Sequence, residues 1–373
     1  MSGLIVHEWI EANGGAEKVV AAMVDAFPGS EVLALWDDAP GSLGTDRVRE
    51  SWVARTPLRR SKIAALPVLP LAWRYAAPRG RAYDWLLVSS HLFAHHVRPR
   101  GLARQAPRLV YAHTPARYLW TPDLDPRGAS LPVRAAAAGL KPLDRRRAHE
   151  LTAVAANSAF VRDRIRDTWQ RDAEVIHPPV GVTSISTGGP WRERLDPSER
   201  AVLDGLPEGF VLGASRMVPY KALDRVIRAG ELSGRPVVLA GGGPDEARLR
   251  AVAAIAAVPV RFVGRVSDAL LYALYERCAV FVFPPIEDFG IMPVEAMAAG
   301  APVVCHRVGG AKESVAVSGL GAAVDVADDD ELARAVASVL GDGRRVEPGA
   351  MASFSRERFV EEIRDFVARH TSS

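Results

Sequence analysis

The sequence predicts an α/β protein made of two doubly wound, Rossmann-like domains with parallel sheets. The chain has 373 residues, which is too long for one compact core and suggests two domains. In its second half, short apolar segments alternate with helical patterns, as in a parallel sheet covered on both faces. The first half repeats this alternation less regularly, so we expect the same architecture there.

The predicted strands are short apolar segments. In the first half they lie at 3–9, 31–36, 84–90, 107–113, 153–158 and 173–179, with the clearest helices at 16–27 and 159–169. In the second half they lie at 210–214, 236–242, 260–264, 279–285, 301–305 and 321–326. Helical crossovers between successive strands are the connections that a parallel sheet requires.

A change in composition marks the domain boundary. At 180–190 the residues Gly, Ser and Thr interrupt the apolar pattern, so we place the linker there. This gives an N-terminal domain of residues 1–180 and a C-terminal domain of residues 181–355. The final stretch, 356–373, carries Phe359, Ile363 and Phe366 at helical spacing, and we expect it to form a helix that docks back on the N-terminal domain.

Charge and cysteine content exclude several classes of protein. With 47 basic and 44 acidic residues, the chain is not a strongly basic nucleic-acid binder. Cys278 and Cys305 lie inside apolar runs, which favours small buried hydrophobes over ligands or a disulfide. The N-terminus lacks the pattern of a signal peptide, and no apolar run approaches the length of a transmembrane helix. We therefore expect a cytoplasmic protein whose only membrane contact is peripheral, at the inner face.

One segment, 55–104, differs in charge from the rest. It holds ten Arg or Lys residues against one acid, Asp84, around the apolar stretch LPVLPLAW. Such a segment can lie on an anionic surface or receive an acidic substrate. The alternative is an ordinary solvated loop and helix face, and the sequence leaves both open.

Charged residues follow several predicted strands at their carboxyl ends, where doubly wound sheets bind ligands. Arg216 follows the strand at 210–214, Glu287 follows that at 279–285, and His113 ends that at 107–113. Gly14 and Gly15 come shortly after the first strand. If the two domains face each other across a cleft, these loops line one opening.

The stretch around Glu287 and Glu295 suggests how a ligand is held. Pro293 suits a first helical position and Gly300 a stop, which predicts a helix at about 293–299 with Glu295 in its first turn. Gly290 permits close approach of a ligand to the backbone, and the helix N-terminus attracts anions. Glu295 could accept hydrogen bonds from two neighbouring hydroxyls, as on a ribose, and Glu287 from another polyol. Each acid alone also fits an ordinary first-turn or loop position.

Arg216 and Lys221 form a second candidate group. They lie between a strand end and the start of a helix, where two cations can flank a phosphate, Arg by a forked contact and Lys as a mobile charge. Without further context, surface charges would be an equally good interpretation.

Several runs closely resemble the group 1 retaining glycosyltransferases of the GT-B fold, particularly bacterial mannosyltransferase-like members. In the second half these are GASRMVPYKALDRVI, LAGGGPDEARL, FVGRVSDALLYALYERC, PPIEDFGIMPVEAMAAGAPVV and GGAKESV. In the first half they are GGAEKV, VYAHTPARYLW and AANSAFVRDRI. The resemblance covers nearly the whole chain. One departure is GGGP at 241–244, where many members carry an acid at the second position.

The resemblance implies a nucleotide-sugar donor in the C-terminal domain and a glycosyl acceptor in the N-terminal one. It assigns the diphosphate to Arg216 and Lys221, the ribose to Glu295, and the donor sugar to Glu287. The remaining positions it implies are Asp288, Phe289 and Gly290 at the donor sugar, Gly14 and Gly15 at the phosphates, and His113 beside the anomeric centre. A histidine that caps a strand end is the other interpretation of His113.

The expected mechanism needs neither a metal nor a cofactor. Positive charge develops at the anomeric carbon and negative charge on the leaving phosphate, which Arg216 and Lys221 could stabilise in place of a divalent ion. No Asp-x-Asp pair follows a predicted strand in a context suited to metal binding. The resemblance favours a front-face substitution with retention, because Glu287 and Glu295 are already assigned to the donor and no other base is evident.

The donor and acceptor are less well defined. The opening HEW and GGAEKV, together with YAHTPARYLW, resemble members that use GDP-mannose, so mannose is the first expectation; a UDP-sugar or a GDP-linked deoxysugar stays open. The acceptor could be a saccharide, a lipid-linked saccharide or a secondary metabolite. The sequence makes no prediction of oligomeric state.

Three other functions fit parts of the pattern. A nucleotide-sugar epimerase would share the diphosphate site but needs no acceptor surface. A nicotinamide-dependent oxidoreductase would share the Rossmann-like domains, but GGGP is not the G-x-G-x-x-G fingerprint. A non-catalytic nucleotide-sugar binding protein would differ from an enzyme only by lack of donor turnover.

Overall fold

The protein is described from a computed structural model that covers residues 2–12, 14–76, 82–98, 106–121 and 131–371. The chain divides into two compact units, Met1–Pro179 with Arg356–Ser373, and Val180–Ser355. We call these unit 1 and unit 2. The linker predicted at 180–190 is not a free connection, because Val182 and Ile185 are buried in the core of unit 2. The Gly and Ser residues of this stretch lie in or beside the short helix Val182–Ser186, which packs on that core.

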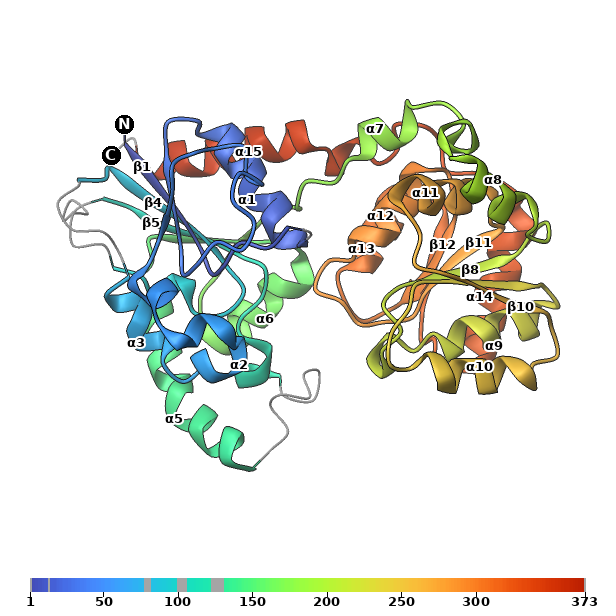
Figure 1. The fold of residues 1–373 in the computed structure, drawn as a ribbon, viewed down its shortest axis with the longest axis horizontal. Helices are drawn as coiled ribbons and strands as arrows, with labels where there is room; N and C mark the ends of the chain where they lie inside the picture. The colour runs from blue at the N-terminus through green and yellow to red at the C-terminus, as the bar shows by residue number, and fades with distance from the viewer. Residues whose placement is uncertain (1, 13, 77–81, 99–105, 122–130, 372–373) are drawn as a thin grey trace. The chain divides into compact units, whose positions relative to one another are not determined.

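Unit 1 contains a parallel sheet (Figure 1) whose described strands run in the order β3-β2-β1-β4-β5-β6-β7. The central strands are paired in register, with Val6 opposite both Leu33 and Val88. The edge strand β3 was not predicted, because its three residues, VRE, carry no apolar run. The strands are β1 (Gly3–His7), β2 (Glu31–Ala34), β3 (Val48–Glu50), β4 (Trp85–Ser90), β5 (Arg108–Ala112), β6 (Ala153–Ala156) and β7 (Glu174–Val175).

Successive residues of β1 serve two cores, because side chains alternate across a sheet. Leu4 and Val6 belong to a cluster with α6, and Ile5 belongs to a cluster with α1 and α15. Figure 1 shows α15 running beside α1, although the two helices are at opposite ends of the chain. The α-helices of unit 1 are α1 (Gly15–Ala26), α2 (Lys62–Ala65), α3 (Leu69–Arg74), α4 (Arg117–Trp120), α5 (Leu131–Ala148), α6 (Ala159–Trp169) and α15 (Arg356–Thr371).

Unit 2 has a second parallel sheet, in the order β10-β9-β8-β11-β12-β13. All its strands were predicted within a few residues, because each is a short apolar run. They are β8 (Val211–Ala214), β9 (Val237–Ala240), β10 (Val260–Gly264), β11 (Val280–Phe283), β12 (Val303–His306) and β13 (Gly321–Val324).

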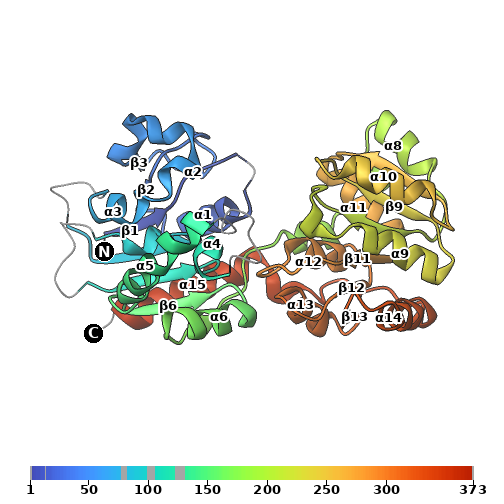
Figure 2. The same cartoon turned by 90° about the horizontal axis from the view of Figure 1, so that it is seen from below.

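Helices cover both faces of this sheet, as Figure 1 shows: α11 and α12 lie on one face, α9 and α14 on the other. Figure 2 shows α13 and α14 beside β12 and β13. The α-helices are α7 (Val182–Ser186), α8 (Pro197–Asp204), α9 (Asp224–Ser233), α10 (Glu246–Ala254), α11 (Asp268–Arg277), α12 (Ile291–Ala298), α13 (Ala311–Ser318) and α14 (Asp329–Asp342).

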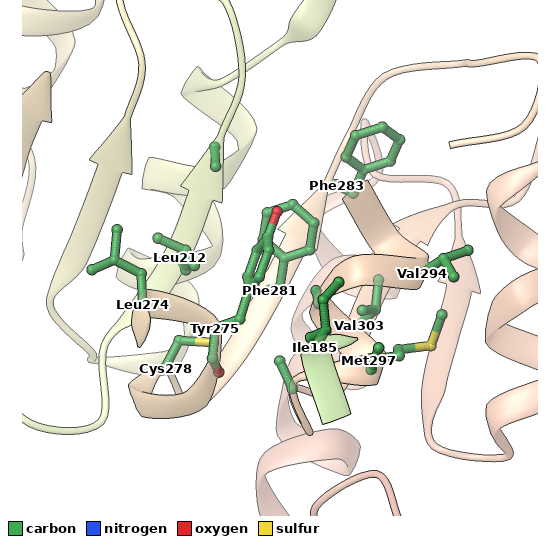
Figure 3. Packing of buried hydrophobic residues seen from close by; sticks show 14 of the residues in the cluster. Ile185, Leu212, Leu274, Tyr275, Cys278, Phe281, Phe283, Val294, Met297 and Val303 are labelled. Carbon is green, nitrogen blue, oxygen red and sulfur yellow. The ribbon is translucent and has the colours of Figure 1, made fainter. Parts of the chain in front are cut away.

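In one core of unit 2, buried residues of β8, β11 and β12 pack against α7, α11 and α12 (Figure 3). The ring of Tyr275 meets that of Phe281 edge to face, with centroids 5.0 Å apart. Cys278 and Cys305 are both buried and free, as predicted. Within the described residues, no helix is long and apolar enough to cross a membrane.

Both sheets reverse their strand order at one point, between β1 and β4 in unit 1 and between β8 and β11 in unit 2. In doubly wound sheets, ligands bind outside the carboxyl ends of the strands at this switch point. We therefore expect the ligand-binding site of each unit at the loops after β1 and β4 in unit 1, and after β8 and β11 in unit 2.

Candidate active site

The loops after β8 and β11 bring two predicted site residues into direct contact. Lys221 Nζ lies 2.5 Å from Glu287 Oε1, although the residues are 66 positions apart. Their side chains are only 12% and 20% exposed, so the pair is partly shielded from water. Arg216 is exposed on the same loop as Lys221, and its guanidinium donates to the Tyr220 hydroxyl at 3.3 Å.

Two glycine-containing segments hold these loops in place. Gly241, at φ +123°, passes so close to the loop after β8 that a Cβ would lie 1.9 Å from the carbonyl oxygen of Ser215. A Cβ on Gly310 would lie 2.3 Å from the carbonyl oxygen of Asp288, and the Gly310 amide donates to the Glu287 carbonyl at 2.9 Å. The GGGP and GGAKESV motifs thus pack against the backbone of the loops that carry the charged residues.

Helix α12 begins earlier than predicted, and this moves Glu295. The helix starts at Ile291 directly after Gly290, whose φ of +91° lets the chain turn into it. Pro293 is the third helical residue, a position where its missing amide costs no hydrogen bond. Glu295 therefore lies in the second turn, not the first, and its side chain is buried.

Two tyrosines of α11 lie near Glu295. Burial raises the pKa of both Tyr272 and Tyr275, and the negative charge of Glu295 raises it further. Asp288 and Phe289, which precede the helix, are buried as well. The predicted donor residues from Glu287 to Glu295 thus form one continuous, mostly buried loop and helix start.

In unit 1, His113 follows β5 as predicted and joins a group of neutral imidazoles. Its Nε2 lies 2.8 Å from Ser89 Oγ, which also lies 3.1 Å from His7 Nδ1. Burial lowers the pKa of His113 well below its usual range, and the nearby His91 and His7 lower it further. Burial likewise lowers the pKa of His7 to about 4. Both rings are therefore uncharged at neutral pH.

Glu8 and His91 complete this group, and sequence reasoning missed both. Glu8 Oε2 lies 3.2 Å from His91 Nδ1, and the Glu8 side chain is fully buried. Burial alone would raise the pKa of Glu8, but His91, His7 and the amides of Ala94 and Leu92 outweigh it and lower that pKa. A signal was present, because Glu8 lies near the end of the strand predicted at 3–9 and His91 directly follows the strand predicted at 84–90.

Gly14 and Gly15 lie at the start of α1. Gly14 is its N-cap residue in an extended conformation, and a Cβ there would lie 1.7 Å from Glu17 Oε2. Glu17 is buried, and its Oε1 accepts from the Glu11 amide at 3.1 Å. A Cβ at Gly14 would therefore displace the Glu17 carboxylate from its contact with the Glu11 amide.

The described residues contain two groups of side chains close enough to be considered for a metal ion. The ligand atoms of His7, Glu8 and His91 lie within 4.8 Å of one another, and so do those of His95, His96 and Asp144. In the first group, His7 Nδ1 already contacts Ser89. In the second, Asp144 accepts from His96 at 2.8 Å and from the indoles of Trp120 and Trp169, each at 2.8 Å. We assign neither group to a metal.

The fold and these loops define a class of protein: two doubly wound units with charged loops at the switch points, the GT-B fold. Solved structures share it along nearly the full chain. HepE from Anabaena, solved in complex with UDP, has a TM-score of 0.67 and 19% identity, over 99% of this chain and 100% of that one. Sucrose-phosphate synthase from Thermosynechococcus elongatus has a TM-score of 0.68 and 18% identity, over 99% of each chain.

The sequence comparisons show similarity to one family over part of the chain. Residues 201–362 match the model described as "Glycosyl transferases group 1", so this segment, less than half of the chain, is similar to that family. A GDP-mannose-dependent alpha-(1-6)-phosphatidylinositol monomannoside mannosyltransferase from Mycolicibacterium smegmatis is 32% identical over 216 residues, 54% of this chain and 56% of that protein. A D-inositol 3-phosphate glycosyltransferase from Salinispora tropica is 31% identical over 59% of this chain and 52% of that protein. The alignments therefore span about half the length of these curated relatives.

Proposed function

We propose that the protein transfers a hexose from a nucleotide sugar to a hydroxyl of a glycosyl acceptor. The observation that carries this proposal is the Lys221–Glu287 pair at the switch point of unit 2, directly before α12 and inside the segment that matches the family. A cation beside a partly buried carboxylate can serve a diphosphate and a sugar hydroxyl at once.

In this proposal the predicted residues keep their roles. Arg216 and Lys221 bind the diphosphate, and Lys221 exchanges its contact with Glu287 for one with phosphate when the donor arrives. Glu287, with the backbone from Asp288 to Gly290, then holds the donor sugar. Glu295 holds the ribose hydroxyls, Gly14 and Gly15 approach the phosphates, and His113 lies beside the anomeric carbon as a neutral imidazole.

GDP-mannose is the proposed donor, supported by the mannosyltransferase among the relatives. A UDP-sugar is the alternative, since the structural neighbour HepE has also been solved with UDP-glucose. A thermal-shift screen against GDP-, UDP- and dTDP-sugars tests both, because a ligand at 100 times its Kd adds roughly 2.7 kcal/mol to stability. Release of nucleoside diphosphate then distinguishes an enzyme from a non-catalytic binding protein. Transfer of the sugar to an acceptor distinguishes a glycosyltransferase from an epimerase.

The proposed mechanism is metal-independent and retains the anomeric configuration, as the family resemblance implies. We expect an α-linked product from an α-linked donor and an initial rate that persists in excess EDTA. Proton NMR of the anomeric signal checks the first expectation, and an EDTA titration of the rate checks the second. A β-linked product, or a rate restored only by magnesium or manganese, would contradict this mechanism.

We also propose that the basic segment 55–104, together with the adjoining Trp52, contacts an anionic surface, either an acidic acceptor or the membrane that carries the acceptor. Together they expose Trp52, Leu71 and Tyr75 at 45%, 62% and 58%, beside the exposed Arg55 and Arg60.

Part of the charge of the basic segment is already paired. Arg59 is bound to Asp38 and Glu50, and Lys62 to Glu11. Four further cations of the predicted segment lie outside the described residues, at positions 79, 81, 100 and 104. Sedimentation with anionic and neutral liposomes at low and high salt tests the contact. If the protein stays in the supernatant under all conditions, the segment is an ordinary solvated face.

A further inference from the structure

An exposed aromatic residue, Tyr220, contacts both cations of the loop after β8. Its hydroxyl accepts a hydrogen bond from Arg216 Nη2 at 3.3 Å. The Nζ atom of Lys221 lies over its ring, 5.2 Å from the centroid. The Tyr220 side chain is 45% exposed, so it adds little to the core of unit 2. Its contacts are instead with the two charges that the proposed function assigns to the diphosphate.

The backbone holds Tyr220 in a short, closed turn. Tyr220 is the middle residue of the single 3₁₀ turn Pro219–Lys221. The Lys221 amide donates to the Val218 carbonyl at 3.0 Å, and the Ala222 amide donates to the Pro219 carbonyl, also at 3.0 Å. The proline restricts φ at the start of the turn, and Ala222 ends it at φ +48°, in the left-handed region that favours glycine. The Tyr220 ring is therefore exposed on a backbone that is fixed.

The ammonium of Lys221 meets two kinds of group. Its Nζ contacts the Glu287 carboxylate at 2.5 Å, and besides the Tyr220 ring it faces Phe283, the last residue of β11, at 6.0 Å from the ring centroid. The carboxylate contact must open before Lys221 can bind a phosphate. A ring face attracts the positive charge itself and leaves N–H donors for an anion. The aromatic rings can thus keep the ammonium in place during that exchange.

The guanidinium of Arg216 gains an orientation from the same residue. An exposed arginine has many rotamers to lose when it is ordered, whereas a forked contact with phosphate requires one orientation. The Tyr220 hydroxyl accepts from one Nη atom and leaves the other N–H groups of Arg216 for a ligand. Part of the ordering is therefore complete before an anion binds.

We propose that Tyr220 is a positioning residue that arranges both cations for the diphosphate: its hydroxyl orients Arg216, and its ring face holds Lys221. This inference rests on the proposed function, in which these two cations bind the diphosphate. All of its contacts lie within unit 2. Ordering the two side chains in advance strengthens binding, because that cost no longer reduces the affinity for the ligand.

Inorganic pyrophosphate is the probe, because it tests the phosphate site without a base, a sugar or an acceptor. GDP and UDP are titrated in parallel, all with the full chain at low salt. We expect Tyr220→Phe, which keeps the ring, to weaken binding about threefold, as for loss of one hydrogen bond. Tyr220→Leu, which removes ring and hydroxyl, should weaken it about tenfold. Ile255→Ala, at an 86% exposed position of unit 2, should bind as the wild type does.

Stability separates positioning from a structural role. The turn Pro219–Lys221 contains no buried residue, so the urea midpoint of each Tyr220 variant should equal that of the wild type. A lower midpoint that accompanies the weaker binding would overturn the proposal.

A double-mutant cycle shows whether the hydroxyl acts through Arg216. In the Arg216→Ala background, Tyr220→Phe should cause no further loss of affinity, because the guanidinium that the hydroxyl orients is gone. NMR titration at millimolar ligand measures these weak affinities. Equal losses from Tyr220→Phe with and without Arg216 would overturn the proposal.

The remaining outcomes distinguish this inference from the proposed function. If the wild type binds none of the three probes, or if Arg216→Ala and Lys221→Ala bind as the wild type does, the phosphate site fails and this inference fails with it. If binding depends on both cations but is unchanged in Tyr220→Leu, only the role of Tyr220 is overturned.

Discussion

At the scale of single residues, the site is a set of charges placed at strand ends and held by contacts far apart in sequence. Lys221 and Glu287 are in direct contact and largely shielded from water, so neither is an ordinary surface charge. Partly exposed pairs of this kind contribute only about 1 kcal/mol or less to stability. Their effect on turnover should therefore be much larger than their effect on folding.

Replacing either cation of the proposed phosphate site should separate these two effects. We expect Lys221→Ala and Arg216→Ala each to lower turnover about a hundredfold or more, because loss of one preorganised charge contact costs about 3 kcal/mol in the transition state. Steady-state rates and urea unfolding measure the two quantities. Arg250→Ala, which removes an exposed cation of α10, is the control. Near-normal turnover in both variants would remove the phosphate assignment.

At the scale of elements, two kinds of contact supplement the strands. Glycine motifs pack against the loops that carry the charged residues, and a helix from the far end of the chain packs on unit 1. GGGP departs from the family pattern by lacking an acid, and the structure gives its first glycine a steric role against Ser215. The terminal helix α15 covers the first unit from the other end of the chain, since Tyr111 and Phe359 meet edge to face with centroids 5.6 Å apart.

Gly241→Ala should disturb the loop that carries Arg216 and Lys221. A Cβ at φ +123° would be strained and would collide with the Ser215 carbonyl, so the loop must move. We expect weaker donor binding and a lower Tm, measured by calorimetry. Gly341→Ala, on α14 with no atom within 4 Å of its added Cβ, should be neutral. Equal behaviour of the two variants would contradict the steric role.

Phe366→Ala should destabilise unit 1 by about 3–5 kcal/mol, as expected for removal of a buried aromatic ring. The side chain is 1% exposed and packs in a cluster with α1 and the sheet. Chemical denaturation measures the loss, and hydrogen exchange should place it in unit 1 and not in unit 2. Asp365→Ala, at an exposed position of α15, is the control. A loss spread equally over both units would argue against this docking.

At the scale of the whole molecule, we expect unit 1 to lose stability in acid through its buried histidines. Burial lowers the pKa of His7 and His96 to about 4, and that of His113 well below its usual range. All three belong to unit 1. An unfolded histidine binds a proton below about pH 6.5, whereas these folded ones do not until the pH is lower. Stability is therefore fully present above about pH 6.5 and is lost as the pH falls toward 4.

We expect the free energy of unfolding of unit 1 to fall from about pH 7 to about pH 5, with more than one proton taken up on unfolding. His7 and His96, whose pKa values are lowered to about 4, each contribute on the order of 3 kcal/mol over the full range. Urea denaturation at constant ionic strength measures the change, and hydrogen exchange, corrected for its intrinsic pH dependence, places it. Equal or greater stability of unit 1 at the lower pH would contradict the neutral, buried state of these rings.

Much of this molecule follows from local sequence. The sequence predicted every strand of unit 2 and the burial of both cysteines. It also placed Arg216, Glu287 and His113 at strand ends. Apolar periodicity reports burial along the chain, and burial is what selects a short parallel strand. The edge strand β3 was not predicted, because an edge strand can form without an apolar run.

Only the tertiary structure decided which of these residues meet. The Lys221–Glu287 contact joins positions 66 apart, and the Glu8–His91 turn joins positions 83 apart. The start of α12 depends on how Gly290 packs against α13, which a proline signal alone does not reveal. Strand order and loop packing set these contacts, and they arise from the burial of whole elements against one another. A local pattern places a side chain at a strand end, and the crossover topology then selects its partner.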